Sequence, residues 1–374
     1  MAIYFLVVFL AVGLSLFDYK RASGGLKCAF VLITVFLGMR YMYGSDYPSY
    51  LSLFKQYNSD GIPIWDIKGM LNSDVYGEIG WQILNKLFGP IGYFGLLFAL
   101  SVFENTVIYR LIKRNVPSQW YWISIIVYLL NTRLFLIGAC SMERQWLSVC
   151  VFVIATKFIE QKKLIPYILL VLLAASFHTS ALILLPFYII GYVKSFSFKI
   201  VHLVIIIALL YIWNQVVPIV LEPLFSGALF EESDVFSEYL RYSGRESRIG
   251  QYSIIGIITD IFLSYFFPFL GLLFYSQMNR TNQLFFLLYI TALFIRPVAN
   301  IIPMVSRMDY YFIIFSICQI PLLLSILSRK RKIWAILSTL MLFAIYIRQT
   351  SSFLTNSSWA KSYMYKTIFS VPWV

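Results

Sequence analysis

The chain has 374 residues, of which 60% are hydrophobic, 18% are aromatic and only 13% are charged. A soluble enzyme of this length carries about twice this charged fraction. This chain therefore has too few polar side chains to cover a globular surface. The net charge is +13, and Lys and Arg gather beside apolar runs. The composition therefore excludes a soluble enzyme. It predicts an all-α, polytopic membrane protein in which residues 1–374 form a single transmembrane domain, with no nucleic-acid partner.

Apolar runs long enough to cross about 30 Å of hydrocarbon recur along the whole chain and predict about twelve transmembrane helices. They begin near Ala2, Leu26, Ile91, Trp120, Trp146, Leu164, Ala181, Ile200, Ser253, Leu284, Tyr310 and Ile333. Two of them, 164–177 and 181–193, are short and contain Pro166 and Pro186. These two runs predict half-helices that meet near His178.

The basic clusters predict one orientation. Each cluster follows an odd-numbered run, so we expect both termini outside and these connections in the cytoplasm. The clusters are Lys20/Arg21/Lys27, Arg110/Lys113/Arg114, Lys157/Lys162/Lys163, Lys194/Lys199, Arg280 and Arg329/Lys330/Arg331/Lys332. The first run has no basic leader and no cleavage site, which predicts a retained helix. The outer connections are the loops 43–90 and 221–252 and the tail after Arg348, where we expect the functional face.

The first candidate motif closes the second apolar run and opens the first outer loop, and it contains Arg40 and Asp46. One interpretation is that Arg40 extends to the lipid headgroups while Asp46 caps an interfacial helix. The other is that Arg40 binds phosphate, and that Asp46 orients a sugar hydroxyl or accepts its proton.

The second motif pairs Arg133 with Glu143 and Arg144 at the outer start of an apolar helix. Backbone N–H groups and the helix dipole attract anions there, so Arg144 suits a diphosphate. The alternative is an internal ion pair of Glu143 with Arg133 or Arg144 that fastens two helices.

One of only two histidines, His178, lies in the third motif, AASFHTSA from Ala174. A lone histidine at a helix junction is often a hydrogen-bonded fastener. On the same outer face as the arginines, however, a neutral imidazole is suited to accept a hydroxyl proton.

Two further arginines, Arg296 and Arg307, are predicted to project where Pro297 and Pro303 break a helix. Two interpretations remain open. The arginines bind an anionic ligand, or Arg307 forms a packing pair with Asp309 or Asp260.

The loop 221–252 has an acidic half, Glu231 to Asp234, and a basic half with Arg241, Arg245 and Arg248. Arginines between aromatic residues suit sugars and phosphates. The acidic half has neither an octahedral oxygen set nor an EF-hand spacing, so we expect no metal site. The four cysteines lack metal or disulfide spacing.

Several segments also resemble a known family. GMRYMYGSDYPSYLSLF from Gly38, EIGW from Glu78, Glu143-Arg144-Gln145, and AASFHTSALILLP from Ala174 are similar in order and spacing to the EpsG-like branch of Wzy-type polysaccharide polymerases. Ser45 stands where Thr is expected, and bulky Trp146-Leu147 stand where smaller residues are common. The resemblance points to Arg40, Asp46, Glu78, Arg144 and His178 as site residues. It also implies an architecture like that of GT-C membrane glycosyltransferases.

The resemblance implies a glycosyltransferase that joins oligosaccharide repeat units carried on undecaprenyl diphosphate, at the periplasmic face of the bacterial inner membrane. The product is O-antigen, capsule or exopolysaccharide. The implied partners are the lipid-linked donor and acceptor, membrane lipid and a protein that regulates chain length, and no cofactor is expected. A flippase, an O-antigen ligase and a membrane acyltransferase are the alternatives.

Overall fold

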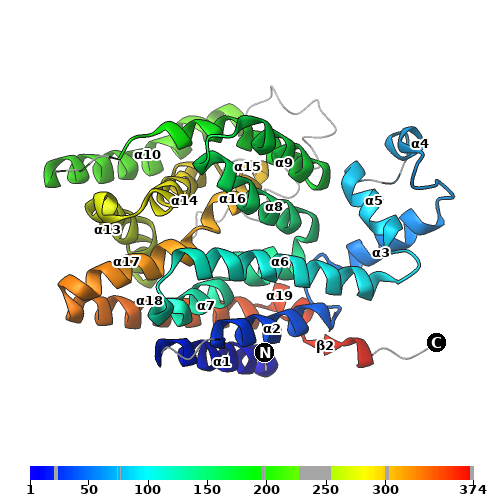
Figure 1. Ribbon diagram of the computed structural model, residues 1–374, viewed down its shortest axis with the longest axis horizontal. Helices are drawn as coiled ribbons and strands as arrows, with labels where there is room; N and C mark the ends of the chain where they lie inside the picture. The colour runs from blue at the N-terminus through cyan, green and yellow to red at the C-terminus, as the bar shows by residue number, and fades with distance from the viewer. Residues whose placement is uncertain are drawn as a thin grey trace. The chain divides into compact units, whose positions relative to one another are not determined.

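The computed structural model describes residues 1–374 except 21–23, 74, 76, 196, 198, 227–253, 300–302 and 371–374. The chain is predominantly helical and divides into two compact units, which are described separately (Figure 1). The first unit comprises Met1–Gly191 and Ile320–Val374, and the second comprises Tyr192–Gln319.

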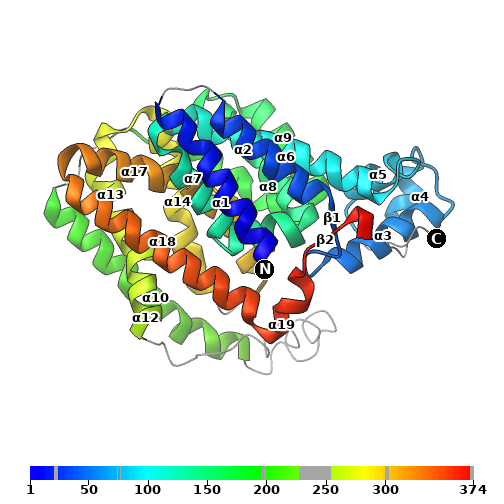
Figure 2. The ribbon, with the colours of Figure 1, turned by 90° about the horizontal axis from the view of Figure 1, so that it is seen from below.

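In the first unit, α1 (Ala2–Leu16), α2 (Gly25–Gly38) and α6 (Tyr93–Asn115) pack in sequence, and α1 also lies against α7 (Tyr121–Leu130) (Figure 2). Asp18 caps the start of α2, because its Oδ1 accepts the Gly25 N–H at 3.2 Å and its Oδ2 accepts the Leu26 N–H at 2.7 Å. A carboxylate there satisfies N–H groups that have no partner within the helix.

The remaining long helices of this unit are α8 (Glu143–Glu160), α9 (Leu164–Phe177), α18 (Lys332–Thr355) and the part of α17 (Ser316–Lys330) from Ile320 onward. A π-helical segment, Arg133–Ala139, follows α7, and a 3-10 helix, Thr179–Tyr192, follows α9. His178 lies between α9 and the 3-10 helix, as the sequence predicts. α8 packs along α9, and α18 packs on α7.

The segment 43–90, which the sequence predicts to be the first outer loop, is itself helical. It contains α3 (Tyr47–Ser59), α4 (Ile67–Leu71) and α5 (Ile79–Leu87), gathered near one end of α6 (Figure 1). The C-terminal tail contains α19 (Ser357–Ala360) and a short strand β2 (Lys366–Thr367). β2 pairs antiparallel with β1 (Arg40–Tyr41), so the C-terminal tail is hydrogen-bonded to the segment that follows α2.

The second unit contains α10 (Ile200–Ser226), α12 (Ile254–Ile261), the π-helical Phe262–Phe266, α13 (Phe267–Phe274), α14 (Arg280–Ala299), α15 (Pro303–Met308) and α16 (Tyr310–Ile313). The prediction that Pro297 breaks a helix is wrong, since α14 continues through it to Ala299. The next helix, α15, begins at Pro303, where proline is tolerated because the N–H groups of a first turn have no partner within the helix.

Within the described residues, six helices are long and apolar enough to cross a membrane, or seven if the pair Ser118–Leu130 and Arg133–Ala139, bent by 52°, is one span. Shorter apolar helices include Gly25–Gly38, Leu164–Phe177, Thr179–Tyr192 and Phe262–Gln277. The chain is therefore an all-α polytopic membrane protein, while the number of about twelve spans is not confirmed.

Candidate functional site

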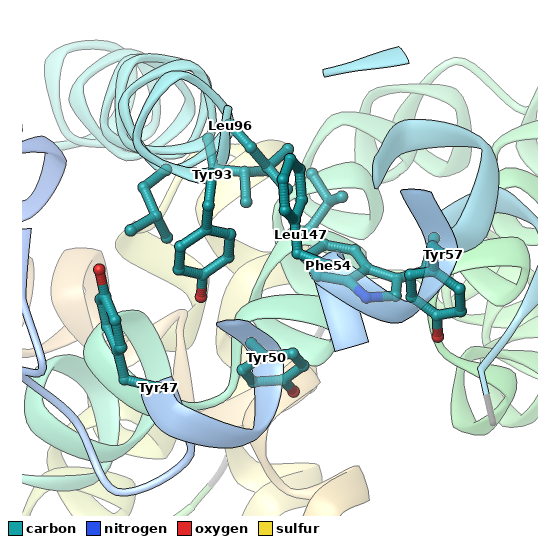
Figure 3. Packing of buried hydrophobic residues seen from close by; sticks show 10 residues of the cluster. Tyr47, Tyr50, Phe54, Tyr57, Tyr93, Leu96 and Leu147 are labelled. Carbon is teal, nitrogen blue, oxygen red and sulfur yellow. The ribbon is translucent and has the colours of Figure 1, made fainter. Parts of the chain in front are cut away.

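An aromatic cluster holds α3 and α5 against the starts of α6 and α8. Its members include Tyr47, Tyr50, Phe54, Tyr57, Trp81, Tyr93, Leu96 and Leu147 (Figure 3). Tyr47 packs edge to face on Tyr93 at 5.4 Å between ring centroids, and Tyr50 packs on Trp81 at 5.6 Å. Edge-to-face pairs of this kind stabilise one arrangement of rings over others. The segment 43–90 is thus a packed lobe that can position side chains.

α5 meets the end of α9 at a glycine. A Cβ on Gly80 would lie 2.3 Å from Ser176 Oγ and 2.8 Å from Ser176 O, so only glycine permits this approach. Glu78 precedes α5 and is brought beside the turn that follows α9, where its Oε1 accepts the Thr179 N–H at 3.2 Å.

The centre of the candidate site is a largely buried ion pair between Arg144 and Glu78. Arg144 Nη1 lies 2.6 Å from Glu78 Oε2, and the two side chains are 9% and 11% exposed. A guanidinium carries five N–H donors, so an arginine held by one carboxylate can also bind an anionic ligand. The pair joins α8 to α5 and, through Thr179, to the 3-10 helix.

Tyr50 lies beside this pair. The Arg144 guanidinium carbon is 5.9 Å from the centre of the Tyr50 ring, within cation–π range. Burial raises the pKa of Tyr50 to about 12, although the Arg144 charge lowers it. The Tyr50 phenol is therefore neutral near pH 7 and acts as a hydrogen-bonding group.

Asp46 belongs to the same region, because it is the N-cap residue of α3 and its backbone O accepts the Tyr50 N–H at 3.0 Å. The Asp46 side chain is half-buried, and its Oδ1 accepts a hydrogen bond from Ser45 Oγ at 2.9 Å. The Ser45 N–H donates to Ser141 Oγ at 3.0 Å, which ties this turn to the segment before α8. A partly exposed carboxylate in this position is suited to accept a proton.

His178 is 8% exposed and ends α9. Its Nδ1 lies 2.7 Å from Ser180 Oγ and 3.4 Å from the Ser180 backbone N–H. A backbone N–H can only donate, so Nδ1 is the acceptor and the proton of the neutral ring resides on Nε2. In this tautomer the ring offers a donor N–H.

A second ion pair, Arg40 with Glu143, lies deeper. Arg40 Nη2 is 3.2 Å from Glu143 Oε1, with side chains 4% and 2% exposed. Tyr93 donates its hydroxyl to the same Oε1 at 2.9 Å, and Arg40 Nη1 donates to Leu37 O at 2.8 Å. The interpretation that Arg40 extends to the lipid headgroups is wrong. So is the pairing of Glu143 with Arg133 or Arg144, because Glu143 pairs with Arg40 and Arg144 with Glu78.

The other predicted residues are not brought to this site by the described contacts. Arg133 is partly exposed at the start of the π-helical segment. Arg296 and Arg307 belong to the second unit, where Arg296 Nη1 donates to Ser264 Oγ at 2.5 Å and Arg307 is exposed. The loop with Arg241, Arg245, Arg248 and the acidic run lies outside the described residues, as does the Asp260 side chain.

Sequence reasoning missed Tyr50, Thr179 and Ser180, although all three lie inside the motifs it singled out. Nothing in the sequence distinguishes Tyr50 from the other tyrosines of its motif, because only packing places one of them on Arg144. Among the described residues, no group of three or more His, Cys, Asp or Glu side chains is arranged to hold a metal ion.

Comparison with known proteins adds an independent result. No curated protein and no solved structure matches the chain. The model of the EpsG family matches residues 26–367, which include both ion pairs, Asp46 and His178. Membership of this family supports a polysaccharide-polymerase type of function. The chain belongs to the EpsG family.

Proposed function

We propose that the protein is a membrane glycosyltransferase that polymerises oligosaccharide repeat units carried on undecaprenyl diphosphate. The observation that carries the proposal is the ion pair of Arg144 with Glu78. The other oxygen of Glu78 accepts the Thr179 N–H, next to His178 in the chain, and Arg144 lies against Tyr50, which is one helical turn from Asp46, in a chain of the EpsG family. Transfer of a sugar from a diphosphate to a hydroxyl requires a fixed arginine, a carboxylate and an N–H donor.

The reaction we propose is one displacement. A hydroxyl of the acceptor unit attacks the anomeric carbon of the donor sugar, a C–O bond forms, and the bond to the diphosphate oxygen breaks with its electron pair. The hydroxyl proton passes to a base. The leaving diphosphate gains negative charge, which preorganised arginine donors stabilise without reorganisation.

In this proposal Arg144 binds the diphosphate, and Glu78 is a positioning residue that fixes the guanidinium. Asp46 is the base. His178 donates its Nε2–H to a substrate oxygen, a change from the base role that its sequence motif favours, because Ser180 occupies Nδ1. Arg40 and Glu143 hold α2, α6 and α8 together and have no direct contact with substrate.

Six other arginines remain proposed ligands for diphosphate or sugar: Arg133, Arg296, Arg307, Arg241, Arg245 and Arg248. The orientation of the basic clusters supports a site on the outer, periplasmic face of a bacterial inner membrane. The partners we propose are the lipid-linked donor and acceptor, surrounding lipid and a regulator of chain length. No cofactor is required, because the diphosphate is itself a good leaving group.

Gene deletion tests the proposal. Lipid-linked surface polysaccharide from deleted and parent cells is separated on a silver-stained gel. We expect the ladder to disappear while a band of core plus one repeat unit survives, because single units still cross the membrane and reach the acceptor. Loss of that band as well would indicate a flippase or a ligase. A complete ladder altered only in mass or antibody reactivity would indicate an acyltransferase.

A further inference from the structure

A polar hollow with a volume of about 330 Å³ lies where α18 ends and α19 begins. Its lining includes Arg348, Gln349, Phe353, Asn356 and Trp359, together with Thr132 at the end of α7. All of these residues belong to the first unit, and none of them is used in the proposed reaction. The volume is at the lower end of the range for small-molecule sites.

The hollow is built by fixed contacts. Thr350 Oγ1 donates to Leu130 O at 2.6 Å, which ties the last turns of α18 to α7. Asn356 Oδ1 accepts the Ser358 N–H at 2.9 Å and so caps α19, which carries Trp359. The Trp359 ring stacks on Phe353 at 5.5 Å between centroids and 16° between planes. The rings are therefore held in place before any ligand binds.

The lining has the chemistry of a sugar site. Stacked aromatic rings offer a flat apolar surface to the C–H face of a pyranose. Gln349 and Asn356 carry amides that both donate to and accept from hydroxyls, and the exposed Arg348 supplies paired donors for sugar oxygens or a sugar carboxylate. A lipid-facing hollow would be lined by apolar side chains instead.

The hollow is also connected to the Asp46 turn. Tyr363 packs edge to face on Phe353 at 5.2 Å, and its hydroxyl lies 2.7 Å from Ser141 Oγ. Ser141 Oγ in turn accepts the Ser45 N–H at 3.0 Å. One tail segment thus packs against both regions, which lie at the same end of the first unit.

We propose that this hollow is a glycan-binding subsite, separate from the Arg144 site, that holds an oligosaccharide stretch of the polymer by stacking on Trp359 and hydrogen bonding to Arg348. The proposal rests on the proposed function for its ligand class. Holding the polymer near the reacting groups favours repeated extension of the same polymer, because a tethered second site raises the effective concentration of its reacting end.

The test uses the purified full chain in lipid nanodiscs and ligand-observed NMR. The probe is a set of free oligosaccharides released by partial acid hydrolysis from the polysaccharide of the cell that carries the gene. We expect saturation transfer to the sugars with the unchanged protein. Trp359→Ala should weaken binding about tenfold, as loss of an aromatic stack predicts, and Arg348→Gln should weaken it further in combination. Trp359→Phe should retain most of the binding.

Trp334→Ala is the matched control, because Trp334 is 59% exposed at the start of α18, whereas the hollow lies at the other end of that helix. Thermal unfolding of each variant checks that the protein is folded. In cells, Trp359→Ala should keep a ladder with shorter chains. Equal binding by Trp359→Ala and the unchanged protein, or displacement of the sugars by short-chain phosphatidylglycerol, would overturn the subsite. The gene-deletion gel tests the proposed polymerase function independently of this subsite.

Discussion

At the scale of single residues, the two arginine–glutamate pairs differ in how deeply they are buried and in which residues surround them. Arg40 and Glu143 are buried among helices, and Tyr93 donates a further hydrogen bond to Glu143. Arg144 and Glu78 are slightly more exposed and lie beside Tyr50 and the turn at His178. A sealed pair contributes to the specificity of packing, whereas a pair at the edge of a site can exchange a partner for a ligand.

The Arg144 pair carries the first prediction. Arg144→Gln should lower polymer formation about 10²- to 10³-fold, the usual cost of removing one donor that stabilises transition-state charge. The measurement is the amount of polymer formed from lipid-linked repeat units by purified protein. Arg114→Gln is the control, since Arg114 pairs with Glu160 at 3.0 Å with a side chain 55% exposed. A folded Arg144→Gln protein with undiminished yield would exclude Arg144 from the reaction.

The second prediction separates the base from the donor. Asp46→Asn should reduce turnover about 10²- to 10⁴-fold, the range for loss of general-base catalysis. His178→Gln should retain much more activity than His178→Phe, because the amide supplies an N–H donor and the phenyl ring does not. Turnover of the three proteins is compared at one pH, with His202→Gln, an exposed histidine, as control. If His178→Gln is as inactive as Asp46→Asn, the imidazole is the base.

At the scale of elements, the contact of α5 with α9 assembles the site from distant parts of the chain. α5 lies in the segment between α2 and α6, and α9 follows α8. Gly80 lets α5 and α9 approach, so that Glu78 meets both Thr179 and Arg144. The pairing of β1 with β2 has a comparable role for the Asp46 turn, because it ties the C-terminal tail beside it.

The third prediction concerns this contact. Gly80→Val should move α5 away from α9, cost about 1–3 kcal/mol or more in stability as overpacking does, and separate Glu78 from Arg144. Thermal unfolding and polymer formation should therefore fall together. Gly13→Ala in α1 is the control, because a Cβ there meets no atom within 4 Å. Normal activity in Gly80→Val would mean that the α5–α9 contact is not needed for the site.

At the scale of the whole molecule, the basic clusters predict the side of the membrane on which the site lies. The segments with Arg110 to Arg114, Lys157 to Lys163 and Arg329 to Lys332 are expected in the cytoplasm. The starts of α3 and α8 and the tail after α18 are then outside. This assignment depends on charge and does not require a fixed number of spans.

The fourth prediction tests this orientation by labelling. After Cys28→Ser, the remaining native cysteines are Cys140, Cys150 and Cys318, all buried. Ser357→Cys in the tail should then react with a membrane-impermeant maleimide on intact cells, and Gln161→Cys should react only after permeabilisation, because both positions are exposed in the fold. The reverse pattern would place the Arg144 site in the cytoplasm and exclude a periplasmic polymerase.

Much of this protein could be predicted without coordinates. Apolar runs must become helices in a membrane, because unpaired backbone groups cannot face hydrocarbon. The short motifs single out Asp46, Glu78, Arg144 and His178, whose roles stay predictions. Which charged side chains pair with each other could not be predicted, because each charge has several oppositely charged residues nearby in the sequence. Packing alone pairs Glu143 with Arg40, Arg144 with Glu78, and Tyr50 with Arg144. The hollow at Trp359 could not be predicted from the sequence either, because its lining comes from the ends of α7 and α18, which are far apart in the chain. Contacts between distant segments depend on the three-dimensional approach of helices, which local periodicity and charge do not encode.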